Sequence, residues 1–329
     1  MARRDKKPGE KVRVAMVGAG KLSTTMHYPS LASFADVEMV GICDIDRERL
    51  RTVGDRYHIE RRYSDYRAMI GELDPDAVYA IGQPHIMYDI WMWCLEQGCN
   101  MYVEKPLALT LHQTHNLADA AAQHDCITQT GFMRRNSPIG NLLRDECLKR
   151  GPITHGVCRF YKCFLARRTG ALDQLMEDGI HVVDTLRWVC GGEAVQIETI
   201  SRRVDLPDLN FHMALIGFDN GSTGVMLASW TSGRRIFDVE MHARGICAEV
   251  ELEGKGYLYS DGNTSGVEYD AKKVAGSDEV WVYGGFRAKN REFIDCVKTG
   301  VPPSSHFGDA FKTMELAHKI LAKALLRGD

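Results

Sequence analysis

The chain has 329 residues, of which 44% are hydrophobic and 26% are charged, with a formal net charge of −3. This length predicts about two domains, and the balanced charge argues against a nucleic-acid or membrane partner. No apolar stretch reaches the ~18 residues that a membrane span needs, and no signal peptide is expected, because no apolar core follows the basic start. The ten cysteines are scattered, so we expect them to be reduced and mostly buried in a cytoplasmic protein without a metal site.

The first part of the chain alternates short apolar runs with helical patterns. Residues 1–10 are expected to be a disordered leader. In chain order, the elements expected next are a strand Val12–Val17, a helix from Lys21 that breaks near Pro29, a strand Val37–Cys43, helices Asp46–Tyr57 and Tyr66–Leu73, a strand Ala77–Ile81, a helix Ile86–Gln97, a strand Asn100–Val103, a helix Thr110–His124 and a strand Ile127–Thr130. Such alternation predicts an α/β domain over residues 11–132 with a doubly wound parallel sheet.

The pattern changes after Gly131, and strands then dominate. The elements expected there are a helix Ile139–Lys149, a hairpin of Phe211–Phe218 and Thr223–Trp230, further short strands within 236–283, and closing helices Lys289–Lys298 and Phe307–Leu326. We therefore expect residues 133–329 to form a second domain of the α+β class with a mostly antiparallel, open sheet.

A glycine-rich turn follows the first strand. Gly18 to Ser23 has the form GxGxxS, in which Gly18 permits a tight turn and Gly20 lets the backbone approach a pyrophosphate at the helix N-terminus. Asp44 ends the next strand, 24 residues after Gly20, where a carboxylate can accept both ribose hydroxyls of NAD. A plain tight turn and a helix-capping aspartate are the alternatives. The combination predicts a Rossmann domain that binds NAD rather than NADP, because Asp44 would repel a 2′-phosphate.

Glu104, Lys105 and Pro106 lie just past another predicted strand of the same sheet. Ligands bind at the carboxyl ends of strands in open α/β sheets, so this tripeptide is a candidate site. An exposed charged loop is the alternative interpretation.

The order of these motifs resembles the Gfo/Idh/MocA family, named for glucose–fructose oxidoreductase and inositol dehydrogenase. The matching stretches are VAMVGAGKL, CDID, IGQP, YVEKPLALT, TGFMRRNSP and EDGIHVVDTLRWVCGG, which fall within residues 14–192. The resemblance implies that Lys105 lies beside the nicotinamide and contacts the reacting hydroxyl, and that Pro106 follows a cis peptide bond. The cofactor-binding residues that it implies are Gly18, Gly20, Lys21, Leu22, Asp44, Ile45, Gln83, Pro84, Glu104 and Lys105.

The resemblance places the catalytic base in the second domain, at His181. The family often has aspartate four residues before this histidine, where the chain has Glu177. On a helix these two residues share one face, so the carboxylate could orient the imidazole. A buried packing histidine is the alternative. Arg135 and Asn136 either contact substrate or form salt bridges at the hinge, and Asp184 is either a second orienting carboxylate or a partner of Arg187.

The expected activity is hydride transfer between NAD and a secondary alcohol of a sugar, cyclitol or sugar derivative. A sensor that binds NAD without turnover and a glycosidase with no net redox change are the alternatives. The resemblance also implies a homodimer or homotetramer that assembles through the second domain.

Overall fold

The structure is a computed structural model that describes residues 10–167 and 170–326. The expected leader at 1–10 therefore lies outside the described residues, except for residue 10. The chain divides into two units, one formed by residues up to Gly131 together with Phe286–Phe311, and the other by Phe132–Gly285 and the residues from Lys312 onward. Within the described ranges, no helix is long and apolar enough to cross a membrane.

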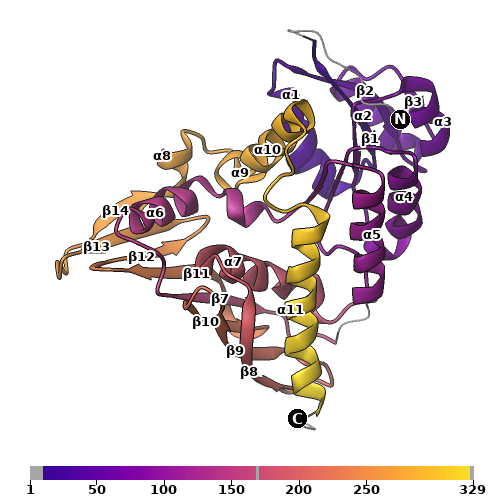
Figure 1. Ribbon diagram of the computed structural model, residues 1–329. Coiled ribbons are helices and arrows are strands. Elements are labelled where there is room, and N and C mark those ends of the chain that lie inside the picture. The colour runs from indigo at the N-terminus through magenta and orange to yellow at the C-terminus, as the bar shows by residue number, and fades with distance from the viewer. Residues whose placement is uncertain (1–9, 168–169, 327–329) are drawn as a thin grey trace. The chain divides into compact units, whose positions relative to one another are not determined.

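The first unit is built on a six-stranded parallel sheet in the order β3-β2-β1-β4-β5-β6 (Figure 1). Its strands are β1 Val12–Val17, β2 Val37–Cys43, β3 Arg62–Tyr63, β4 Ala77–Ala80, β5 Met101–Val103 and β6 Thr128–Thr130. Its helices include α1 Tyr28–Ala32, α2 Arg47–Arg56, α3 Tyr66–Leu73, α4 Pro84–Glu96 and α5 Leu111–Gln123. This strand order is that of a doubly wound Rossmann sheet, as the sequence predicted.

The helix expected from Lys21 is irregular, as its proline suggested. A π-helical turn at Ser23–His27 (η1) precedes α1, in which Pro29 occupies the first turn. Proline has no N–H to donate to the preceding turn, so a regular α-helical hydrogen-bond ladder cannot pass through it. The extra residue of a π turn changes which side chains face the sheet, and such turns are frequent at functional sites.

The expected second domain of 133–329 needs one correction, because Phe286–Phe311 belongs to the first unit. Helix α10, Phe286–Thr299, packs against α1 and places Phe293, Ile294 and Val297 in the core of that unit. The loop after α10 is hydrogen-bonded to the edge strand β6, since the Thr130 N–H donates to the Ser305 carbonyl at 2.9 Å. An amphipathic helical pattern shows which face is buried but not which core receives it, so the sequence could not reveal this return.

The second unit contains an eight-stranded sheet in the order β14-β13-β12-β11-β7-β10-β9-β8 (Figure 1). Its strands are β7 His155–Cys163, β8 Ala194–Arg202, β9 Phe211–Phe218, β10 Thr223–Ser229, β11 Thr231–Ala243, β12 Ile246–Glu251, β13 Lys255–Ser260 and β14 Val267–Asp270. All neighbouring pairs are antiparallel except β7 with β10. The predicted α+β domain with a mostly antiparallel sheet is thus confirmed.

The second unit also contains helices and helical turns. They are η2 Met133–Asn136, α6 Pro138–Leu148, the π turn η3 Leu175–Gly179, α7 Ile180–Cys190, α8 Ala271–Ala275, α9 Val280–Tyr283 and α11 Phe307–Leu326, of which the first turn belongs to the other unit. Helix α7 packs on β7 and β10. The strands expected as far as residue 283 end at Asp270 instead, where the Asp270 side chain caps α8 by accepting from the N–H groups of Lys272 and Lys273.

The cysteines agree with the sequence analysis. All ten are free, and six of them are buried. The six buried cysteines pack as small apolar residues in the cores of both units.

Candidate active site

The carboxyl ends of the parallel strands gather the predicted cofactor residues at one edge of the first sheet. Gly18 ends β1 with φ +103°, and its N–H donates to the Cys43 carbonyl of β2 at 2.8 Å. A Cβ at this position would lie 2.1 Å from the carbonyl oxygen of Ile81, which ends β4. Only glycine meets both the conformation and the close approach of the neighbouring strand.

Gly20 is different, because a Cβ added there would meet no described atom within 4 Å. Its lack of a side chain is not needed for packing within the unit. Open space beside the backbone of a strand–helix turn is the feature that lets a pyrophosphate approach it.

The Asp44 carboxylate is held in place by the glycine turn. The Ala19 N–H donates to Asp44 Oδ2 at 2.7 Å, and the Asp46 N–H donates to Oδ1 at 2.9 Å. The helix cap that follows is Asp46, which accepts from the N–H groups of Glu48 and Arg49. The capping role considered for Asp44 therefore belongs to Asp46, and Asp44 lies oriented beside the glycine turn.

Apolar side chains are exposed at the same edge. Ile45 after β2 is 91% exposed, Ile86 at the start of α4 is 62% exposed, and Leu22 after the glycine turn is 39% exposed. Gln83 is exposed just before α4, and Pro84 occupies its first turn. Exposed apolar groups around a polar turn are typical of a ligand-binding edge, where an adenine or nicotinamide ring can cover them.

Glu104 follows β5 and is buried, so the Glu-Lys-Pro tripeptide is not an exposed charged loop. Its Oε1 lies 3.1 Å from Nε2 of the fully buried His27, and its Oε2 accepts from the Lys105 N–H at 3.3 Å. The Lys105–Pro106 peptide bond is cis, as expected. Lys105 itself is half-buried at the sheet edge that carries Gly18 and Asp44.

Sequence reasoning missed the residues behind Glu104. His27 Nδ1 lies 3.1 Å from Asn290 Oδ1, and the Asn290 amide donates to Ser30 Oγ at 2.8 Å. His27 lies on the helix that follows the glycine turn, but no spacing in the sequence relates it to Glu104 or to Asn290. Only its position near the fingerprint could have drawn attention to it.

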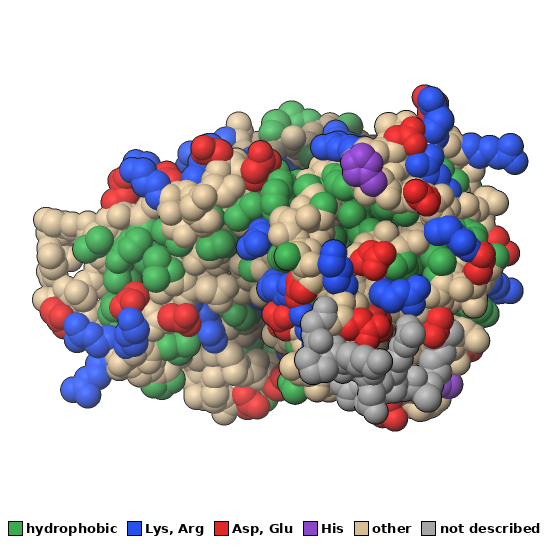
Figure 2. Space-filling model, turned by 90° about the horizontal axis from the view of Figure 1, so that it is seen from above, with side chains coloured by type: hydrophobic (Ala, Val, Ile, Leu, Met, Phe, Trp, Pro, Cys, Tyr) green, Lys and Arg blue, Asp and Glu red, His purple; other side chains and the backbone are tan. Residues whose placement is uncertain are grey.

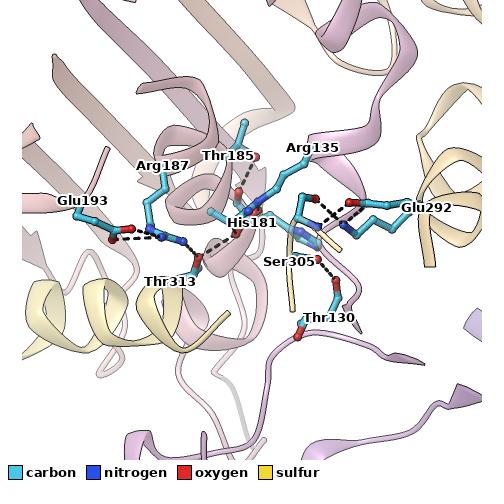
Figure 3. A network of polar contacts seen from close by, with 12 residues as sticks. Thr130, Arg135, His181, Thr185, Arg187, Glu193, Glu292, Ser305 and Thr313 are labelled. Carbon is cyan, nitrogen blue, oxygen red and sulfur yellow. Dashed lines mark hydrogen bonds and ion pairs between the residues drawn. The ribbon is translucent and has the colours of Figure 1, made fainter. Parts of the chain in front are cut away.

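In the second unit, Glu177 and His181 lie on either side of a change in helix type. Glu177 belongs to the π turn η3, and His181 is buried in the first turn of α7. The Thr185 hydroxyl donates to the His181 carbonyl at 2.7 Å (Figure 3). The spacing of Glu177 and His181 predicted a regular helix, whereas a π turn carries the carboxylate.

Arg135 and Asp184 form a buried ion pair with each other. Arg135 Nε donates to Asp184 Oδ2 at 2.8 Å and Nη2 donates to Oδ1 at 2.6 Å, and the Thr313 hydroxyl also donates to Oδ1. Arg187 instead binds Thr313 and Glu193 (Figure 3). The bidentate contact uses the Nε and Nη2 edge of the Arg135 guanidinium and both oxygens of Asp184. Asn136 lies beside them in η2.

Asp178, the residue after Glu177, anchors the π turn. Its carboxylate accepts from Lys162 Nζ of β7 at 2.8 and 2.7 Å and from Trp230 Nε1 at 3.0 Å. Gly179 is needed beside it, because a Cβ there would lie 2.9 Å from the Trp230 ring. These contacts fix the segment that carries Glu177 and His181.

Charges elsewhere are mixed. On the face drawn in Figure 2, basic and acidic side chains alternate among apolar ones without a patch of a single sign. Across residues 10–167 and 170–326, no three His, Cys, Asp or Glu side chains come together in a way that could hold a metal ion.

Comparison with known proteins agrees with this geometry. The Gfo/Idh/MocA family model, described as an oxidoreductase family with an NAD-binding Rossmann fold, matches residues 12–132. Over these residues the chain is similar to the Gfo/Idh/MocA oxidoreductases. It is 23% identical to myo-inositol 2-dehydrogenase of Thermotoga maritima over 320 residues, which are 89% of this chain and 90% of that protein.

Two further proteins are similar to the chain. The chain is 25% identical to D-glucoside 3-dehydrogenase of Escherichia coli over 201 residues, which span 56% of each protein. A crystal structure of a dehydrogenase from Chromobacterium violaceum shares the fold with a TM-score of 0.87 over 97% of both chains, at 22% identity. The likeness to the solved structure thus extends over both units.

Proposed function

We propose that this chain is a member of the Gfo/Idh/MocA family and an NAD-dependent dehydrogenase that oxidises a secondary alcohol of a sugar, cyclitol or sugar derivative. The observation that carries the proposal is the edge of the parallel sheet, where one set of strand ends presents the glycine turn, the oriented Asp44 and the Glu-Lys-Pro turn. The named activities of the inositol and glucoside dehydrogenases support the substrate class.

The residues of the edge fit a dinucleotide. The backbone at Gly20, with Lys21 and Leu22, would receive the pyrophosphate, and Asp44 with Ile45 would hold the adenosine ribose and its base. Gln83, Pro84 and Glu104 would border the nicotinamide half. When bound, NAD⁺ supplies the acceptor for the hydride that leaves the alcohol carbon.

The chain itself would move the proton and stabilise charge. The Lys105 ammonium stabilises the alkoxide that develops on the substrate oxygen, an effect worth several kcal/mol where water is excluded. His181 accepts the hydroxyl proton as general base, and Glu177 orients its ring. Burial of Glu104 and its hydrogen bond to the Lys105 N–H hold the lysine's backbone.

A screen of free cyclitols and monosaccharides with NAD, followed by NADH absorbance, tests this function. Net NADH formation with at least one free alcohol is the expected result. Tight NAD binding without turnover of any alcohol would favour a sensor. Release of an aglycone from glycosides without NADH formation would favour a glycosidase.

Two glycine variants should separate the fold from cofactor binding. Gly18→Ala should lower the free energy of unfolding by more than ~1 kcal/mol, because its φ is positive and its Cβ would collide with the Ile81 carbonyl. Gly20→Ala should leave stability within about 1 kcal/mol of wild type, since its Cβ meets no described atom, yet weaken NAD binding by blocking the pyrophosphate. Urea unfolding and NAD titration measure the two effects. Unchanged NAD affinity in Gly20→Ala would contradict the placement of the pyrophosphate.

NAD should be preferred over NADP. Both oxygens of Asp44 already accept backbone N–H groups, so the carboxylate faces the ribose position as a fixed negative charge that repels a 2′-phosphate. The nearby Arg49 is engaged with Asp46. Comparison of kcat/KM for the two cofactors measures the preference, and a higher value for NADP would refute it. Asp44→Ser should narrow the difference.

We also propose that the chain forms a homodimer or homotetramer. The solvent face of the second sheet carries exposed apolar side chains on β8 and β9, namely Ile200, Met213 and Leu215. An apolar sheet face of this kind favours packing against a second copy.

A further inference from the structure

A fully buried histidine is left without a role by the proposed function. His27 ends the π turn that follows the glycine turn, and its ring nitrogens lie 3.1 Å from Glu104 Oε1 and 3.1 Å from Asn290 Oδ1. Histidine and carboxylate side chains are seldom fully buried unless they are paired. This pair therefore joins the helix that begins at the dinucleotide turn to the residue that precedes Lys105.

The donors and acceptors around the ring define its hydrogen-bonding state. Because the Asn290 amide nitrogen donates to Ser30 Oγ, its oxygen faces His27 as an acceptor. Glu104 presents a carboxylate oxygen to the other ring nitrogen. Both ring nitrogens thus lie within hydrogen-bond distance of an oxygen atom that can accept.

Aromatic rings enclose this pair. The His27 ring lies 5.1 Å from that of Tyr102, 5.7 Å from Phe286 and 6.0 Å from Tyr79, measured between centroids. In such surroundings an unpaired charge is costly, so ring and carboxylate each need the other. Loss of one partner should displace the other rather than leave it in place.

Glu104 is confined on its remaining sides as well. Its Oε2 accepts from the Lys105 N–H, and the backbone of Gly131 lies so close that a Cβ there would be 2.3 Å from Oε1. The carboxylate therefore has one position, set by His27 on one side and by Gly131 on another. The backbone of Lys105 is bonded to it.

We propose that His27 and Glu104 are positioning residues, which hold the Lys105 turn in its working conformation and tie it to the dinucleotide-binding helix. The catalytic consequence rests on the proposed function of Lys105. The clamp itself, from His27 through Glu104 to the Lys105 N–H, is a property of the chain alone.

The test compares His27→Ala, Glu104→Ala and Glu104→Gln with a matched control, Tyr28→Phe. Tyr28 is the buried neighbour of His27 on the same helix, and its hydroxyl has no hydrogen-bond partner among the described residues. The measurements are kcat and KM with an alcohol that the wild-type protein oxidises, NAD affinity by titration, and hydrogen exchange of the Lys105 amide in the full-length chain without substrate.

We expect both alanine variants to lose about 10–100-fold in kcat, because small misplacements of catalytic groups have effects of that size. NAD affinity should fall much less than kcat, since the glycine turn and Asp44 are untouched, and the Lys105 amide should exchange faster. Glu104→Gln should keep most of the wild-type kcat and most of the protection of the Lys105 amide from exchange. Its amide oxygen can accept from the Lys105 N–H while its NH₂ donates to a neutral imidazole. Tyr28→Phe should match wild type.

Wild-type kcat and exchange in the alanine variants would overturn the proposal, as would a Glu104→Gln variant as damaged as Glu104→Ala. If the alanine variants do not fold, His27→Asn decides the same question, because its shorter amide can keep the bond to Asn290 but cannot reach Glu104. If wild type oxidises no alcohol, the proposed function fails, while the exchange of the Lys105 amide still reports on the clamp.

Discussion

Replacing Lys105 by alanine should reduce turnover by at least ~10²–10³-fold, the usual effect of removing one group that stabilises a developing oxyanion. The loss should appear in kcat, with little change in NAD affinity, because the charge acts on the substrate oxygen in the transition state. The glycine turn and the Asp44 carboxylate do not depend on the Lys105 side chain. Steady-state kinetics with the best alcohol, together with NAD titration, provide the measurement.

The control for this experiment is Lys105→Met, which keeps most of the side-chain volume without the charge. It should be as impaired as Lys105→Ala if charge is what matters. A near-normal kcat in either variant would remove Lys105 from the mechanism. Weak NAD binding in both would instead assign the lysine to the cofactor.

Replacing His181 by alanine should reduce oxidation by ~10²–10⁴-fold, the usual contribution of a general base. A neutral imidazole must accept the hydroxyl proton, so in wild type kcat/KM for oxidation should rise with pH over the range in which histidines titrate, near ~6.5 for an unperturbed side chain. That acidic limb should vanish in the variant. The measurement is a pH profile of kcat/KM in the direction of alcohol oxidation.

Two neighbouring carboxylates offer a matched comparison for the same profile. Glu177→Gln removes the charge proposed to favour the imidazolium, so the acidic limb should move to lower pH and the plateau should fall. Asp178→Asn should instead lower stability and leave the limb where it is, because that carboxylate is occupied by Lys162 and Trp230. A profile unchanged in both the His181 and Glu177 variants would transfer the role of base to Lys105.

The sequence predicted local features well where a single physical property of a residue fixes the local structure. The bounds of β1, β2 and α3 match the expected ones, because apolar periodicity and turn residues act over a few positions. Gly18 was assigned to a tight turn, and the structure adds the close approach of Ile81 that makes glycine obligatory. Asp44 was located correctly at the end of β2, since parallel strands bring their ends to one edge.

The roles of charged residues were harder to predict. Arg135 was expected either to contact substrate or to form a salt bridge, and Asp184 either to act as an orienting carboxylate or to pair with Arg187. The two residues instead bind each other across 49 positions of the sequence. The sequence shows that both are charged, but not which opposite charge a folded chain brings within hydrogen-bond distance. The regular helix assumed at Glu177 failed for a related reason, because the π turn is stabilised by Lys162 and Trp230 from other elements.

By itself, then, the sequence determined the class of both units and which residues lie at the carboxyl edge of the parallel sheet. Strand ends, glycine turns and the position of a carboxylate after a strand are local properties, and the right-handed crossovers of a parallel sheet leave few ways to assemble them. Only the tertiary structure decided that α10 returns to the first unit and that His27 meets Glu104, 77 residues away. Such contacts join apolar faces and buried polar side chains that are distant in the chain. Which residues meet depends on the packing of the whole core and not on any single stretch of residues within it.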